Sequence, residues 1–241
     1  MRSNLPELDE GEIVSVRVYP PAKQRIIPAG ANDPKMRPVV VSLHVAVSMA
    51  RSLYRWFRRK VNGVEVGIES HLYLRRDGSW EQYRELDLEA DGQGGGNTWQ
   101  SPTGRLGAII IETQGMGSGR YGWLTRKQKA ALKTFALWAR DHLDIPLRVV
   151  RVPHPRTLAM GGWGYHSLFD EWNSLRKTCP GWRRIRWFKT RFAPWMREQN
   201  KTYVFASKGD TWAKIASSRD MSVPELIHLN QPEDGSRVRV R

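Results

Sequence analysis

The chain has 241 residues, which is enough for one domain of medium size and a second, smaller one. Its hydrophobic fraction of 40% is typical of a soluble globular protein, and no apolar run approaches the roughly 20 residues needed to span a bilayer. The formal net charge of +15 predicts attraction to polyanions, namely nucleic acid, acidic lipid head groups or anionic wall polymers, and charge alone does not choose among them.

Residues 1–36 are interrupted by proline and glycine, which favours an N-terminal arm with one short strand, Ile13 to Tyr19. The first residues contain no apolar core of a signal peptide. We therefore expect the protein to be made in a cytoplasm.

A β-branched run, Val39 to His44, is typical of a buried strand and ends in an imidazole. By itself, a histidine at the end of a strand is more often a hydrogen-bonded residue than a metal ligand. Beyond this strand, apolar residues recur at helical spacing and predict a helix that packs one face against the core. These residues are Met49, Leu53, Trp56 and Phe57.

Two further strand patterns have ionisable residues in them. Residues 70–80 predict a hairpin in which a strand containing His71 reaches an Asp-Gly turn and returns. The next predicted strand, residues 107–115, is strongly apolar until Glu112. Because a buried acid is costly without a partner, Glu112 is either a solvated carboxylate at an exposed strand end or a general base beside a bound water.

After a glycine-rich loop at 91–97, Thr125 predicts the N-cap of a second helix. The buried stripe of this helix is Leu132, Phe135, Ala136, Ala139 and Leu143. Strands and helices at this spacing indicate an α/β domain, with a mixed central sheet flanked by helices and a pocket at one sheet edge.

The only cysteine, Cys179, follows His166 by 13 residues and stands two residues after Lys177. One sulfur cannot form a disulfide within the chain, so Cys179 is a buried apolar side chain, a nucleophile or a metal ligand. Catalytic zinc takes three protein ligands and leaves one position for water. His44, at the end of its strand, would supply the third ligand.

His44, His166 and Cys179, in this order and with Pro-Gly after the cysteine, resemble the ligands of the zinc N-acetylmuramoyl-L-alanine amidases. This family includes phage lysins and peptidoglycan recognition proteins. The hairpin at 70–80 and the strand at 107–115 also resemble segments of the family, so the likeness covers about residues 37–190.

The resemblance implies a peptidoglycan hydrolase that cleaves the amide bond between N-acetylmuramic acid and L-alanine. It implies Zn2+ held by His44, His166 and Cys179. It also implies Glu112 as the general base and Lys177 as the group that stabilises the oxyanion of the tetrahedral intermediate.

The hairpin histidine, His71, is not a ligand in the family, and this chain has Ser70 where some phage members carry a catalytic tyrosine. We expect His71 to contact the substrate. Three aromatic residues are further candidates for the substrate groove, because aromatic rings can stack on sugar faces, and burial in the core is the alternative for each of them. These are Trp99, Trp163 and Tyr165.

Residues 182–197 are rich in basic and aromatic residues and contain no acid. Four apolar residues fall on one helical face: Ile185, Phe188, Phe192 and Trp195. This face packs on the sheet, or the segment is a basic amphipathic helix that contacts a membrane surface or an anionic wall polymer, and the two roles are compatible. We expect the helix to end before Pro194.

The last residues resemble a LysM module, a class that binds glycans containing N-acetylglucosamine. The pattern is βααβ: a strand, a helix capped by Asp210 or Thr211 and bearing Trp212, a second helix capped by Ser222, and a short final strand. The resemblance implies glycan contacts at Asp210, Thr211 and Trp212. The last connection is shorter than usual, and a folded tail without a ligand is the alternative.

We thus expect an N-terminal arm at 1–36, a zinc amidase domain at 37–190, a linker at 191–201 and a LysM-like module at 202–241. The resemblance to phage endolysins implies a monomer that is made in the host cytoplasm and acts on bacterial peptidoglycan after release. A catalytically silent peptidoglycan-recognition protein is one alternative, and the complete ligand set argues against it. A nucleic-acid-binding protein is another, but the sequence contains no Cys/His finger spacing and no RNA-binding motif.

Overall fold

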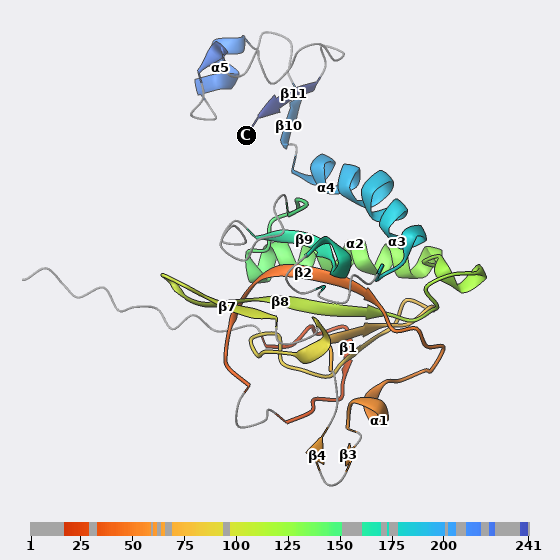
Figure 1. Cartoon of the computed structure of the whole chain (residues 1–241). Coiled ribbons are helices and arrows are strands. Elements are labelled where there is room, and N and C mark those ends of the chain that lie inside the picture. The colour runs from red at the N-terminus through yellow and green to blue at the C-terminus, as the bar shows by residue number, and fades with distance from the viewer. Residues whose placement is uncertain are drawn as a thin grey trace, which may run out of the picture.

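A computed structural model gives the structure of the protein, and it describes residues 17–28, 33–58, 60–61, 64–65, 69–93, 97–150, 161–169, 173, 178–200, 202–205, 211–217, 222–224 and 237–240. Its main body is a mixed α/β domain with helices packed on a central sheet, which confirms the predicted fold class (Figure 1). Among the described helices, none has the length and apolar composition required to cross a membrane.

The described part of the central sheet has seven strands in the order β1-β6-β5-β8-β2-β9, with β7 beside β8. β2, β5, β8 and β9 run parallel to one another, whereas β6 and β7 are antiparallel to their neighbours β5 and β8. The strands are β1 (Ala22–Gln24), β2 (Arg37–Val45), β5 (Leu72–Leu74), β6 (Trp80–Gln82), β7 (Thr98–Ser101), β8 (Gly104–Thr113) and β9 (Gly162–Tyr165). A separate ribbon pairs β3 (Lys60–Val61) with β4 (Val64–Glu65).

The two central strands, β2 and β8, carry different chemistry on their two faces, because successive side chains of a strand alternate in direction. Leu43 and Ile111 join the large apolar core that also contains the buried residues of the long helix. Their neighbours His44 and Glu112 therefore lie on the opposite face. The parallel register pairs these two residues directly.

The longest described helix, α2 (Arg126–Leu143), covers one face of the sheet and begins where the sequence predicts. The Thr125 hydroxyl accepts the Gln128 N–H at 3.0 Å, and the Gln128 side chain accepts the Thr125 N–H at 3.0 Å, which forms a capping box. Four residues of the predicted stripe are fully buried, and the fifth, Leu143, packs against the core.

The helix expected after β2 is much shorter than its pattern predicts, because α1 contains only Tyr54–Phe57. Leu53 and Phe57 are buried as expected. Met49 and Trp56, in contrast, are 42% and 59% exposed. The predicted apolar face is therefore divided between the core and the surface.

Hydrogen bonds from the sheet hold the segment before α1 out of a helical conformation. The Tyr73 hydroxyl donates to the Ala50 carbonyl at 2.7 Å. The Tyr83 hydroxyl accepts the Leu53 N–H at 2.8 Å. These tertiary contacts use backbone groups that a helix would pair internally, so they override the local pattern.

Residues 182–199 form one helical run: α3 (Trp182–Trp187), a π-helical turn (Phe188–Phe192) and α4 (Ala193–Gln199). The expectation that the helix ends before Pro194 is wrong. A proline inside a regular α-helix clashes with the carbonyl four residues earlier, and the wider π turn relieves this constraint. Phe188 and Phe192 are buried against Tyr165 and Trp163, so the apolar face packs on the sheet.

The described residues near two expected domain boundaries also belong to the main core. Phe192 and Met196, within the expected linker at 191–201, are fully buried in the core cluster. In the expected arm at 1–36, β1 pairs with β6, and Tyr19 packs on Phe135 with ring centroids 4.9 Å apart. The strand expected at 13–19 is not seen at 17–19, and residues 13–16 lie outside the described residues.

In the C-terminal residues, β10 (Thr202–Phe205) pairs antiparallel with β11 (Arg237–Val240), and α5 (Trp212–Ser217) lies between them in sequence. Thr211 caps α5, because its hydroxyl accepts the Lys214 N–H at 3.2 Å. Trp212 is exposed, whereas Ile215 and Ala216 are buried. The order of these elements fits the expected pattern, and the LysM assignment stays a prediction.

Candidate metal centre

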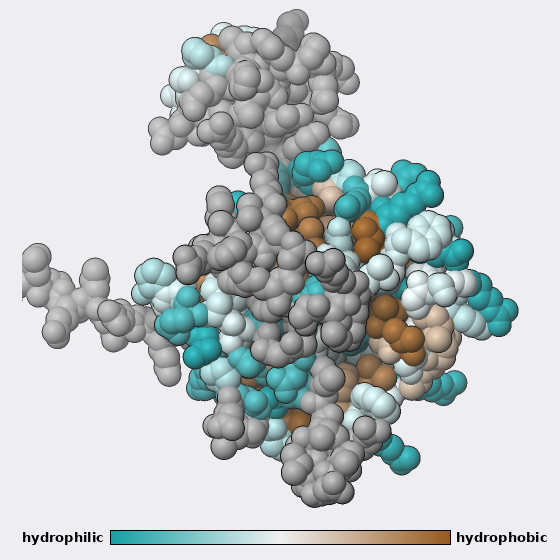
Figure 2. Space-filling view, viewed as in Figure 1, coloured by the Kyte–Doolittle hydropathy of each residue, from teal (hydrophilic) through white to brown (hydrophobic). Residues whose placement is uncertain are grey.

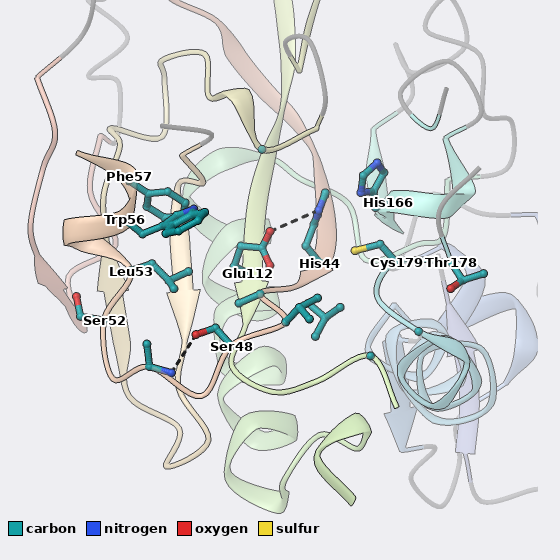
Figure 3. A pocket seen from close by; sticks show the side chains of 17 residues that line it. His44, Ser48, Ser52, Leu53, Trp56, Phe57, Glu112, His166, Thr178 and Cys179 are labelled. Atoms are coloured by element: carbon teal, nitrogen blue, oxygen red, sulfur yellow. Dashed lines mark hydrogen bonds and ion pairs between the residues drawn. The ribbon is translucent and has the colours of Figure 1, made fainter. Parts of the chain in front are cut away.

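Three side chains that the sequence analysis selects as metal ligands meet at one edge of the central sheet. His44 is the penultimate residue of β2, His166 directly follows β9, and Cys179 precedes α3 (Figure 3). Their ligand atoms all lie within 4.8 Å of one another. This is the edge at which the parallel strands end, where ligands bind in open α/β sheets.

Glu112 lies beside this cluster because the sheet register places it opposite His44. The Nδ1 atom of His44 is 3.7 Å from Oε1 of Glu112. The rings of His44 and His166 have centroids 4.5 Å apart, and the two residues are 2% and 7% exposed. The donor atoms are therefore largely shielded from solvent before any ligand arrives.

The turn that contains Cys179 is packed against the loop that follows β8. The Cys179 carbonyl accepts the Ser167 N–H at 3.0 Å, which connects the cysteine to the His166 turn. Gly181 has a φ of 91°, and a Cβ atom at this position would lie 2.5 Å from the Gly117 carbonyl oxygen. Only glycine permits both this conformation and this close approach.

The donor set suits zinc. Two imidazoles and a thiolate are ligands that zinc prefers, and three protein ligands leave one position for water. Oε2 of Glu112 is buried without a hydrogen-bond partner, and burial raises the pKa of the Glu112 carboxyl to about 8. A cation at the cluster would stabilise the ionised carboxylate and so lower the cost of burying it.

A cavity of about 890 Å³ extends from the cluster. Figure 3 shows the three ligand candidates on one side of it, Glu112 in the middle, and an apolar group from the α1 segment on the other side. That apolar group is Leu53, Trp56 and Phe57. The cavity thus joins a polar, metal-binding end to an apolar end, which is the usual composition of a ligand site.

The aromatic residues predicted to contact substrate do not line this cavity. Trp163 is fully buried in the core, and Tyr165 packs against Phe188 with ring centroids 5.4 Å apart. Trp99 pairs with Leu106, six residues before Glu112 on β8, which places it about 20 Å along the strand from the acid. Trp163 and Tyr165 are therefore buried in the core, which is the alternative stated for them, and contact of the three aromatic residues with substrate stays a prediction.

His71 lies inside the sheet and has a structural role, and its expected contact with substrate stays a prediction. It is fully buried, its Nε2–H donates to the Leu88 carbonyl at 2.8 Å, and its Nδ1 accepts the Ile110 N–H at 3.0 Å. Burial lowers the pKa of His71 to about 4. The neutral ring therefore joins the hairpin strand to β8.

We expect this histidine to make the fold sensitive to acid. Its pKa is lower in the folded protein than the value of about 6.5 in the unfolded chain, so the unfolded chain binds the proton first. The stability contribution is complete above pH ~6.5 and is lost as the pH falls towards 4, by up to about 3 kcal/mol. Urea unfolding at a series of pH values measures this slope. In His71→Gln the slope should flatten over this range, and an unchanged slope would assign it to other groups.

Arg184 is a residue of the site that the sequence analysis missed. It lies in the first turn of α3, is buried, and donates from Nη1 to the carbonyls of Met116 and Gly122 at 2.8 Å each. Burial lowers the pKa of the guanidinium to about 10, and the nearby Cys179 and Glu112 oppose this shift. Arg184 thus ties the loop after β8 to the helix that follows the cysteine. In the sequence it is one of several arginines in a basic stretch, and nothing distinguishes it from the others.

We expect Arg184→Met to weaken zinc binding about 10- to 100-fold, because the turn that delivers Cys179 loses its connection to the loop. Competition titration against a chromophoric chelator, on protein shown to be folded, measures this affinity. Arg84→Met is the matched control, since Arg84 is equally buried and donates to the backbone carbonyls of Ile27 and Pro28. It should lose stability and keep its zinc affinity. Equal zinc affinities in Arg184→Met and the wild type would make Arg184 a structural residue only.

Lys177 and Asp210 lie outside the described residues, so their predicted roles stay predictions. Thr178, the neighbour of Lys177, lines the cavity.

No family model matches this sequence, and no curated protein is significantly similar to it. Solved structures similar to the chain include the N-acetylmuramoyl-L-alanine amidase LysC from Clostridium intestinale URNW, with 15% identity over 66% of this chain and 89% of that chain and a TM-score of 0.42. A selenomethionine derivative of AmpD is 18% identical over 69% of this chain and 90% of its own, with a TM-score of 0.45. The catalytic domain of XlyA is 17% identical over 70% and 93% of the two chains, with a TM-score of 0.43. Identities at this level concern the fold alone.

Proposed function

We propose that the protein is a zinc-dependent N-acetylmuramoyl-L-alanine amidase that hydrolyses bacterial peptidoglycan. The observation that carries this proposal is the convergence of His44, His166 and Cys179 beside the half-buried Glu112 in one cavity. These residues come from different parts of the sheet edge: His44 from β2, Glu112 from β8, His166 from the turn after β9 and Cys179 from the turn before α3. They are also the residues whose order and surroundings resemble the amidase family.

A bound Zn2+ would supply a water of lowered pKa and would polarise the carbonyl of the scissile amide. Glu112 is placed to move the proton: Oε2, which has no hydrogen-bond partner in the described structure, accepts it from the attacking water. As the water oxygen bonds to the carbonyl carbon and the C–N bond breaks, Glu112 delivers the proton to the L-alanine nitrogen. The backbone pairing of Glu112 with His44 keeps the carboxylate at the carboxyl end of β8, beside the cluster.

We assign oxyanion stabilisation to Lys177 on the strength of its sequence position. It is followed by Thr178 and Cys179, both of which line the cavity. A fixed ammonium at this wall would stabilise the negative charge that develops on the carbonyl oxygen.

The direct test incubates the purified protein with isolated peptidoglycan, with and without a chelator, and identifies the new end groups by mass spectrometry. We expect free N-acetylmuramic acid carboxyls and free L-alanine amino groups, formed only when metal is present. New reducing sugar ends, or cleavage within the peptide, would reject the amidase assignment. Binding without any new end group would support a silent recognition protein instead.

We also propose that residues 202–241 are a LysM-like module that holds the enzyme on the wall. Deleting residues 201–241 should leave hydrolysis of small soluble muropeptides nearly unchanged and weaken the action on intact wall, because tethering raises the effective substrate concentration without changing the chemistry. Pull-down of the isolated tail by wall material gives a direct check. Equal clearing of intact wall by the shortened protein would contradict a targeting role. Origin from a phage, action after release from the host cytoplasm and a monomeric state stay predictions.

A further inference from the structure

Two large aromatic side chains are exposed beside the cavity. Trp123, near the end of the loop that follows β8, and Trp182, the first residue of α3, are 39% and 54% exposed. Their rings meet edge to face with centroids 5.7 Å apart. Trp182 directly follows Gly181, which lines the cavity together with Gly117 of the loop. The tryptophan pair therefore continues the cavity wall onto the surface.

A guanidinium group fixes this pair. The Arg183 guanidinium carbon lies 5.3 Å from the Trp123 ring centroid and 5.1 Å from that of Trp182. Arg183 also donates to the Gly119 carbonyl. Cation–π contacts of this kind favour a defined arrangement of rings and charge.

A second aromatic and cationic group joins Arg120 and Tyr121 of the same loop to Arg76 of the hairpin turn between β5 and β6. Arg76 and Arg120 stand over the Tyr121 ring at 5.2 Å and 4.6 Å from its centroid. Arg76 also donates to the Trp123 carbonyl at 3.3 Å, which joins this group to the tryptophan pair. We call the whole surface the aromatic-cationic shelf: Arg76, Arg120, Tyr121, Trp123, Trp182 and Arg183.

The two segments that carry most of the shelf contain basic residues and no acidic ones. Neither residues 113–140 nor residues 178–197 contain an aspartate or a glutamate. The acid next to Arg76 in sequence is Asp77, whose carboxylate accepts hydrogen bonds from Ser79. Strongly hydrophilic side chains mixed with nearly neutral ones are visible at the right edge of Figure 2, over α3 and the loop after β8. Such a surface attracts a ligand that carries negative charge.

The helical run from α3 to α4 is not suited to entering a bilayer. A helix that lies in a membrane interface needs an exposed apolar face. Here Phe188 and Phe192 are buried against the sheet. What this run presents outward next to the shelf is positive charge, including Arg186, Lys189 and Arg191. This favours a polymer in solution over a lipid surface as the partner.

We propose that the aromatic-cationic shelf binds an anionic glycan strand of the cell wall and thereby positions the polymer whose amide bond enters the cavity. Sugar rings have apolar faces that the exposed indole rings can contact, and the acidic groups of the polymer can pair with the arginines. The inference rests on the proposed function, because only then do the shelf and the cavity serve one ligand. It names a binding surface on the main domain in addition to the proposed C-terminal module.

The test measures binding of the full chain to insoluble peptidoglycan stripped of secondary polymers, in a Glu112→Gln background so that the ligand is not consumed. Trp182→Ala and Arg120→Ala should each raise Kd at least about 5-fold. The effect of Arg120→Ala should shrink as salt increases. Arg140→Ala is the matched control, because Arg140 is an exposed arginine on α2 that is paired with Asp141. It should stay within about two-fold of the background.

Zinc content and thermal unfolding of each shelf variant must match the background protein, which excludes an effect through Cys179. Unchanged binding by both shelf variants would overturn the inference. So would stronger shelf-dependent binding to phosphatidylglycerol vesicles or to duplex DNA than to peptidoglycan. If the shelf variants lose binding but the wild-type protein releases no amidase end groups, the proposed function fails and the binding surface stands. If the wild type cleaves and the shelf variants bind normally, the proposed function stands and the inference about the shelf fails.

Discussion

Replacing Glu112 by glutamine should lower the rate of amide hydrolysis about 100-fold or more while zinc stays bound. The substitution keeps the shape of the side chain and removes its ability to accept a proton. Because His44, His166 and Cys179 are untouched, the metal content should not change. The effect should appear in kcat rather than in KM, since the acid acts on the reacting atoms.

Steady-state kinetics on a soluble muropeptide, together with elemental analysis, measure both quantities. A nearly normal rate would require another base, and the described site offers poor replacements. Tyr73, which is paired with Glu112 in the sheet, uses its hydroxyl to donate to the Ala50 carbonyl, and burial raises its pKa far above neutral. His71 has both ring nitrogens engaged with backbone groups. A retained rate would therefore reject the proposed chemistry as a whole.

Replacing Cys179 by serine should remove most of the zinc, and activity with it. A hydroxyl is a far poorer ligand than a thiolate at neutral pH, so only two imidazoles would remain from the described cluster. The wild type should contain one zinc per chain. Elemental analysis after dialysis compares the two proteins.

Thr178→Ala serves as the control for this substitution. Thr178 precedes the cysteine and lines the same cavity, but its hydroxyl is not part of the ligand cluster. This variant should keep its zinc. Full zinc and activity in Cys179→Ser would remove the thiolate from the site.

The elements that the sequence predicts well are those with a strong local pattern. The strand before His44 and the strand before Glu112 are continuous apolar runs, and the helix after Thr125 has both a cap signal and a regular stripe. The hairpin follows from its Asp-Gly turn. Each of these signals is read within one segment, and in each case the packing of the chain agrees with it.

Local sequence patterns mispredict the structure where distant backbone groups decide the conformation. The segment before α1 has a helical pattern, but hydrogen bonds with Tyr73 and Tyr83, which lie 23 and 30 residues further along the chain, hold it in a non-helical conformation. Arg184 binds carbonyls 62 and 68 residues away, and a backbone carbonyl leaves no signature in the sequence. Trp163 and Tyr165 are close to His166 in sequence, but the helical run from α3 to α4 packs on β9 and buries both rings. Nothing in the sequence of β9 alone shows that helices cover its aromatic residues.

The pairing of His44 with Glu112 across two central strands has a consequence for how the site opens. Both residues lie near the carboxyl ends of β2 and β8, two interior strands that are hydrogen-bonded on both sides, and such strands are among the last parts of a fold to open. Cys179 stands in a loop outside the sheet, attached through the Ser167 N–H and the Gly117 contact. We therefore expect local opening at the cysteine turn to need less free energy than separation of His44 from Glu112. A transient opening of this turn would move the Cys179 thiol away from the cluster while His44 and Glu112 keep their register in the sheet.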